Sequence, residues 1–194
     1  MNPLPNHSLR WVEISRSVIA AALGGSSAVD IQSDAYGFGT ELVSRIALEA
    51  GQSVDGTERD WVYRAHAANA QRLCALVINV KEIPAGEEVS YGGHFRTERP
   101  TTLALVAAGF ADGVPRLDPT GGVVEIAGER CPIAGRIAMD QLIVDVTGLT
   151  VSVGDVATIW GGAISIDEWS QWSGRGVHEI GSTLAPRVTR VEVE

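Results

Sequence analysis

The feature that most constrains the fold is a regular succession of short β-type segments and turns in the second part of the chain. After Leu73, runs of apolar and β-branched residues recur between glycines, prolines and aspartates. The clearest predicted strands are Ala75–Val80, Thr101–Ala108, Val123–Ile126, Ile143–Val146 and Val156–Trp160. The turn signals between them are Pro84–Glu87, Ala111–Gly113, Pro119–Gly122 and Val153–Asp155. This spacing predicts a mainly β domain that forms an antiparallel barrel or sandwich. Near the end of the chain, Ser165–Glu168 predicts the start of a helix.

The first part of the chain instead alternates short strands and helices. Strands are predicted at Trp11–Ile14 and Val29–Ile31, with helices at Val18–Leu23, capped by Ser15 or Ser17, and at Phe38–Ala50. A complete (β/α)₈ barrel takes roughly 250 residues, so too little chain remains to close one. We therefore predict an α+β protein with a βαβα remnant at residues 1–57, a connecting helix at 58–72 and a β domain at 73–194. The last part of the remnant, Gln52–Thr57, is predicted to be a polar junction that leads into the connecting helix.

Charge and cysteine content exclude several classes of partner. The formal net charge is -9 and the pI is near 4.9, which disfavours nucleic acid and anionic membranes as partners. Cys74 and Cys131 have neither a CxxC spacing nor a disulfide framework, which indicates reduced thiols in a cytoplasmic protein. The sequence contains no targeting signal and no run of apolar residues long enough to span a membrane. The four histidines have no metal-site spacing, so no metal is expected.

Lysine content limits covalent chemistry. The chain has a single lysine, Lys81, among 15 basic residues, the others being arginines. Any imine formed by a lysine amine would therefore have to use Lys81.

Five motifs, in a fixed order, resemble the C-terminal β domain of alanine racemases. They are Val80–Gly92, Gly109–Arg116, Pro132–Gln141, Val153–Asp155 and Pro186–Arg190. Upstream, Trp11–Ile14 and Ser33–Gly39 are similar to the first strand of that family and to the loop after its second strand. The resemblance implies the C-terminal domain fold of that family, joined to a short remnant of its cofactor-binding barrel.

The resemblance also implies what the chain lacks. In the family a lysine directly before the Ser33–Gly39 stretch holds pyridoxal phosphate as a Schiff base, and here that position is Gln32. An amide cannot form an imine, so no cofactor is expected, and pyridoxal phosphate enters only through family resemblance. The family's tyrosine near the cofactor phosphate is Pro186 here. Lys81 corresponds to a lysine in the β domain of the family, far along the chain from the loop that holds the cofactor. The resemblance therefore does not assign Lys81 the imine role.

The resemblance further implies candidate site residues. Tyr91 corresponds to the catalytic tyrosine that reaches the partner's active site, and Tyr36 to a cofactor-binding tyrosine. The predicted substrate-binding or pocket residues are Phe110, Asp112, Arg116, Arg136, Met139 and Asp140. Simpler interpretations stand beside these: Tyr91 as a packing aromatic at a strand end, Tyr36 as cover for a helix end, Asp112-Gly113 as a turn, and Met139 as a core side chain.

Several functions remain open. The preferred hypothesis is a degenerate alanine-racemase-like protein that works as a dimeric binding or partner protein without racemase activity on its own. It would form a homodimer or pair with a full-length racemase, and a small-molecule ligand is compatible with it. A second hypothesis is a cofactor-independent isomerase or cyclase that uses Tyr91, Asp112, Asp140 or Arg136 as acid, base or anion holder. Two further alternatives are that the chain is still an alanine racemase, and that an internal deletion has left a product without a selected function.

Overall fold

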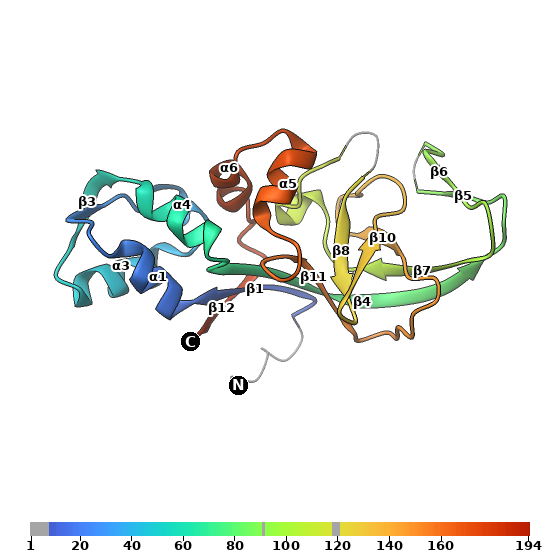
Figure 1. Cartoon of the computed structure of the whole chain (residues 1–194), viewed down its shortest axis with the longest axis horizontal. Helices are drawn as coiled ribbons and strands as arrows, with labels where there is room; N and C mark the ends of the chain where they lie inside the picture. Colours follow the sequence, from blue (N-terminus) through green and yellow to red (C-terminus); the bar gives the residue numbers. More distant parts are fainter. Residues whose placement is uncertain (1–7, 91, 118–120) are drawn as a thin grey trace.

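The β domain is organised around one long strand. The computed structural model describes residues 8–90, 92–117 and 121–194. Its strand β4 (Gln71–Ile83) pairs through its first half with β1 (Arg10–Ser15) and β11 (Val156–Trp160), and through its second half with β7 (Thr101–Val106). The register shifts between Val77 and Asn79, where an irregularity lets the strand bend. β4 therefore runs the length of the β domain and links its two halves (Figure 1).

The main sheet confirms the predicted fold class. Its strands follow the order β10-β7-β4-β11-β8-β9, and β1 and β12 (Thr189–Val193) lie off this path. The remaining bounds are β8 (Val123–Ile126), β9 (Glu129–Pro132) and β10 (Leu142–Asp145). An antiparallel bridge between Ile133 and Val144 brings the two ends of this order together, as in a barrel. All five strands predicted after Leu73 are present, in a mixed α+β fold that is mostly antiparallel sheet.

The strand predicted at Trp11–Ile14 is present as β1, but its partners lie in the main sheet. β1 pairs antiparallel with β4 and parallel with β12, with Trp11 opposite Thr189. Ser15, one of the two predicted caps, accepts a hydrogen bond from the backbone N–H of Val18 at the start of α1 (Arg16–Leu23). The first and last described strands of the chain are therefore neighbours.

The α/β remnant lies at one end of β4 (Figure 1). It consists of α1, β2 (Ala28–Val29), α2 (Gln32–Tyr36), α3 (Thr40–Glu49), β3 (Ser53–Glu58) and α4 (Asp60–Ala67). β2 and β3 pair in parallel, as a βαβ unit requires. The apolar side chains of this region and of the β domain form one continuous core, which includes Phe38, Trp61 and Trp160.

Two predictions for residues 52–72 are wrong. The expected junction Gln52–Thr57 is mostly strand β3, which looks polar because it is largely exposed on both faces. Gly56 allows its close approach to β2, since a Cβ there would lie 2.0 Å from the carbonyl oxygen of Ala28. The helix expected over Glu58–Arg72 is only α4, because Asn69 takes a left-handed conformation (φ 53°) that ends it, and Arg72 lies in β4.

The remaining elements cover one face of the β domain or extend from its end. α5 (Ile166–Ser173) begins with the predicted capping box between Ser165 and Glu168, and α6 (Val177–Ser182) packs against α2, α4 and α5. A 3₁₀ turn, η1 (Phe110–Asp112), replaces the predicted turn after β7. The short pair β5 (Glu88–Val89) and β6 (Phe95–Arg96) lies at the end of the domain farthest from the remnant (Figure 1). Residues 119 and 120 of a predicted turn lie outside the described residues.

No helix in the described part of the chain is long and apolar enough to cross a membrane.

Candidate functional site

A buried carboxylate, Asp112, joins three distant segments of the chain. Its Oδ1 atom accepts hydrogen bonds from Nη1 of Arg10 at 3.0 Å and from Nε of Arg187 at 2.7 Å. Its Oδ2 atom accepts the backbone N–H of Gly109 at 2.8 Å. Because the side chain is completely buried, its charge depends on these donors for stabilisation. Asp112 therefore fastens β1 and the segment before β12 to η1.

Arg187 extends this network to the surface. Its Nη2 atom donates to Oδ1 of Asp140 at 2.7 Å, while its Nε atom binds Asp112. The hydrogen bond to Asp140, together with the bond to Asp112, raises the pKa of the Arg187 guanidinium above its already high usual value. Arg187 therefore stays charged and links the two predicted pocket carboxylates.

The other predicted pocket residues gather beside this network. The backbone N–H groups of Phe110 and Ala111 donate to the carbonyl oxygens of Ala138 and Met139, so the two loops lie side by side. The guanidinium carbon of Arg116 lies 4.3 Å from the centre of the Phe110 ring, a cation–π contact. The side chains of Phe110 and Met139 are exposed, which contradicts the simpler interpretation of Met139 as a core residue.

Two arginines line a small cavity at this place. A cavity of about 240 Å³ is bounded by Arg116, Leu117, Arg136 and Ile137. The hydroxyl of Ser90 donates to the carbonyl oxygen of Arg136 and accepts its backbone N–H, which ties the end of β5 to this loop. The arrangement can bind an anion on its two guanidinium groups. Tyr91, the predicted catalytic residue that follows Ser90, lies outside the described residues.

Tyr36 lies elsewhere, in the interior of the α/β remnant. Its hydroxyl donates to Oδ2 of Asp30 at 2.9 Å, and Asp30 also accepts Nε of Arg59 and the backbone N–H of Gln32. Burial, and then the hydrogen bond to Asp30, raise the pKa of Tyr36. Burial alone would raise the pKa of Asp30, but the hydrogen bonds from Gln32, Tyr36 and Arg59 outweigh it and lower the pKa. The phenol of Tyr36 is therefore protonated and already occupied.

Helix α6 closes the space around Tyr36. The His178 ring centre lies 5.8 Å from that of Tyr36 and 3.8 Å from that of Tyr63. Gly37 takes φ 86°, and a Cβ on it would lie 2.0 Å from the carbonyl oxygen of Gly181. Burial, and then the charge of nearby His178, lower the pKa of His66 to about 3. The ring nitrogen Nε2 of His66 is buried without a hydrogen-bond partner in the described part of the chain.

These residues do not fit a covalently held pyridoxal phosphate. Gln32, the position that the resemblance assigns to the cofactor lysine, carries an amide, and Tyr36 has its hydroxyl bound to Asp30. Lys81 is on the half of β4 that pairs with β7, opposite Leu103, whereas α2 contacts α3 and α6. Nor do three His, Cys, Asp or Glu side chains gather as metal ligands among the residues that the structure describes.

Sequence reasoning missed the partners of these residues. Arg10 lies 102 positions from Asp112, and Asp30 and Arg59 are 29 positions apart. No local spacing signals such contacts, because only the fold brings the segments together. Arg187 stood within a motif, but nothing there pointed to its two carboxylate partners.

Comparison with known proteins identifies the β domain. The family model described as the C-terminal domain of alanine racemase matches residues 70–192. The alanine racemase of Laribacter hongkongensis is 42% identical over 123 residues, which are 62% of this chain and 34% of that protein. That of Deinococcus deserti is 45% identical over 122 residues, 62% of this chain and 35% of that protein. The chain spans about a third of the length of the curated relatives it matches.

Solved structures agree with this assignment. The alanine racemase of Streptomyces lavendulae shares 43% identity with a TM-score of 0.62, over 64% of this chain and 34% of that one. The Bartonella henselae alanine racemase, solved with covalently bound pyridoxal phosphate, gives a TM-score of 0.80 over 96% of this chain and 100% of that one. At 15% identity this second likeness shows the fold alone. Sequence, family model and fold agree that the chain belongs to the alanine racemase family, through the C-terminal domain of that family.

Proposed function

We propose that this chain is a dimeric binding or partner protein, built on a racemase-type β domain, without racemase activity of its own. The observation that carries the proposal is the contrast between two parts of the molecule. The network of Arg10, Asp112, Arg187 and Asp140 is complete, whereas the Gln32–Tyr36 segment has no amine and no free phenol. A racemase needs an electron sink and an acid or base on each face of the substrate, so this segment cannot supply that chemistry.

The exposed edge of the remnant supports association. β2 and β3 form a parallel sheet of two strands, and parallel sheets are ordinarily covered on both faces and flanked by further strands. Such an edge favours pairing with another chain. We propose a homodimer, with a full-length racemase as the alternative partner. Cys74 and Cys131 are buried free thiols, which supports a cytoplasmic location.

The exposed surface beside the Asp112 network supports ligand or partner binding. Phe110 and Met139 expose apolar surface next to the cavity between Arg116 and Arg136. An apolar rim around two cations suits a partner, or a small molecule, that carries a carboxylate or phosphate. The same cavity favours the second hypothesis, acid–base chemistry without a cofactor, with Asp140 as the exposed carboxylate nearest to Arg187.

The deciding experiment is a titration of the purified chain with pyridoxal phosphate. We expect no saturable imine absorbance band, no stoichiometric product trapped by borohydride and no racemisation of alanine. Sedimentation equilibrium on the same preparation should give a dimer. A stoichiometric trapped adduct with turnover would overturn the proposal, and a monomer at all concentrations would overturn its dimeric part.

A further inference from the structure

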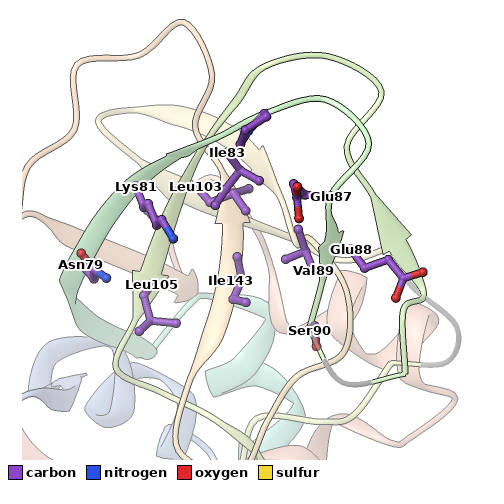
Figure 2. Close-up of a pocket in the computed structure, with 12 residues that line it drawn as sticks. Asn79, Lys81, Ile83, Glu87, Glu88, Val89, Ser90, Leu103, Leu105 and Ile143 are labelled. Carbon is purple, nitrogen blue, oxygen red and sulfur yellow. The ribbon is translucent and has the colours of Figure 1, made fainter.

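A second hollow lies at the opposite end of the β domain from the α/β remnant. It is a groove of about 550 Å³ between the face of β4, β7 and β10 and the segment that contains β5 (Figure 2). Its volume is typical of pockets that hold a small molecule. The residues that line it are Asn79, Lys81, Ile83, Pro84, Glu87, Glu88, Val89, Ser90, Leu103, Ala104, Leu105 and Ile143. It is separate from the cavity between Arg116 and Arg136.

The floor of the groove is apolar. Val89 and Leu103 belong to a small hydrophobic cluster of their own, against which Ile83 and Ile143 pack while they stay partly exposed. Strand register explains this arrangement, because Lys81 pairs with Leu103, and Leu105 pairs with Ile143 on the next strand. Figure 2 shows Ile83, Leu103 and Ile143 between Lys81 on one side and Val89 on the other. Val89 and Leu103 are themselves buried, so the partly exposed Ile83, Leu105 and Ile143 offer the hydrophobic surface that a ligand could cover.

Opposite charges stand on the two sides of this floor. The ammonium of Lys81 lies on the β4 side, and the carboxylates of Glu87 and Glu88 lie on the β5 side (Figure 2). None of the three forms an ion pair with another residue in the described part of the chain. Figure 2 also shows Glu88 extending away from the groove, whereas Glu87 stays beside Val89. A ligand would thus meet one cation and one anion across an apolar span.

We propose that this groove binds a short apolar peptide as a zwitterion, with its carboxylate at Lys81, its apolar side chains on the floor and its ammonium group at Glu87. Charge complementarity selects this ligand, since a fatty acid would leave Glu87 facing an apolar tail. The site needs neither pyridoxal phosphate nor a dimer. It therefore adds a ligand class to the binding role proposed above, and its failure would leave that proposal standing.

The test is calorimetric titration of the full chain with trileucine. We expect saturable binding, with Lys81→Met and Glu87→Gln each weakening it about two- to fivefold, the range for exposed ion pairs. Glu82→Gln, an exposed carboxylate next to Lys81 on β4 that does not line the groove, is the matched control and should bind as the parent does. Circular dichroism melts confirm that each variant folds.

Capped peptides assign each charge to its partner. Trileucine amide should bind the parent more weakly than trileucine does, and Lys81→Met should bind both equally, because the variant lacks the group that senses the carboxylate. N-acetyl-trileucine should likewise bind the parent more weakly than trileucine does, and Glu87→Gln should bind both peptides equally. Absence of saturable binding, equal loss in Glu82→Gln, or octanoate binding as tightly as trileucine would each overturn the proposal.

Discussion

Nη1 of Arg10 lies 3.0 Å from Oδ1 of Asp112, so a residue at the start of the first strand neutralises a buried carboxylate after β7. Asp112→Asn should remove the charge that Arg10 and Arg187 share. We expect a loss of about 2 kcal/mol in the free energy of unfolding, less than for a fully buried pair, because Arg187 can rehydrate. Urea unfolding measures the loss. Asp140→Asn, an exposed carboxylate on the same arginine, should cost less than about 1 kcal/mol, and equal losses would contradict this account.

Stability should fall in mild acid because of His66. Its pKa is about 3 in the folded protein and near 6.5 in the unfolded chain, so the unfolded state binds more protons between these values. The stabilisation is complete above about pH 6.5 and is lost as the pH falls toward 3. Between pH 7.5 and 5 the loss should be roughly 2 kcal/mol by urea unfolding. His66→Phe should flatten this dependence, whereas the exposed His94→Gln should leave it unchanged.

Tyr36 should ionise at a higher pH than an ordinary tyrosine. Its pKa is raised by burial and by the hydrogen bond to Asp30, so a phenolate absorbance titration should show a delayed step that belongs to Tyr36. A raised pKa stabilises the fold below pH 10, and this contribution is lost as the pH rises through the folded value. Tyr36→Phe should abolish the delayed step and cost about 1 kcal/mol. A delayed step that persists in this variant would refute the assignment.

Gln32→Lys should not restore cofactor binding. The new amine would stand in a segment where the Tyr36 hydroxyl is held by Asp30 and where α6 packs on Gly37. We expect no imine absorbance band when pyridoxal phosphate is added. The double variant Gln32→Lys, Tyr36→Phe serves as control, since it frees Asp30 without opening the contact with α6. An adduct trapped on residue 32 itself in either variant, located by peptide mapping, would show that the space is open.

Gly109→Ala should disturb the candidate site from its backbone. A Cβ there would lie 2.3 Å from the carbonyl oxygen of Ala138, where η1 meets the loop that carries Met139. Overpacking of this kind costs about 1–3 kcal/mol, measured by thermal unfolding. Gly176→Ala is the matched control, because nothing lies within 4 Å of its Cβ position. If both variants melt alike, the close approach does not matter for stability.

Sequence patterns predicted the elements whose apolar side chains face a core. The strands after Leu73 and helix α1 were predicted because period-two or helical patterns mark them. β3 was missed because its side chains are mostly exposed, so backbone pairing and Gly56, rather than an apolar pattern, determine it. The end of α4 was misplaced because one residue, Asn69, adopts a left-handed conformation.

The candidate site was predictable only where motifs carried it. Resemblance placed Asp112, Arg116, Arg136 and Asp140 in one region; in the structure Arg187 links Asp112 to Asp140, and Arg116 and Arg136 line one cavity. Arg10 was not predictable, since its contact with Asp112 depends on the pairing of β1 with β4. The groove at Lys81 was also beyond the sequence, because it arises where β5 stands away from the sheet.

The parallel pairing of β1 with β12 has a mechanical consequence. Both strands run in the same direction, with Trp11 opposite Thr189 and Ser15 opposite Val193. A force that pulls on residues before β1 and after β12 therefore acts at opposite ends of the pair, along the strands. All the hydrogen bonds between them bear that load at once, instead of breaking one after another. The pair is therefore loaded in shear and should resist mechanical unfolding.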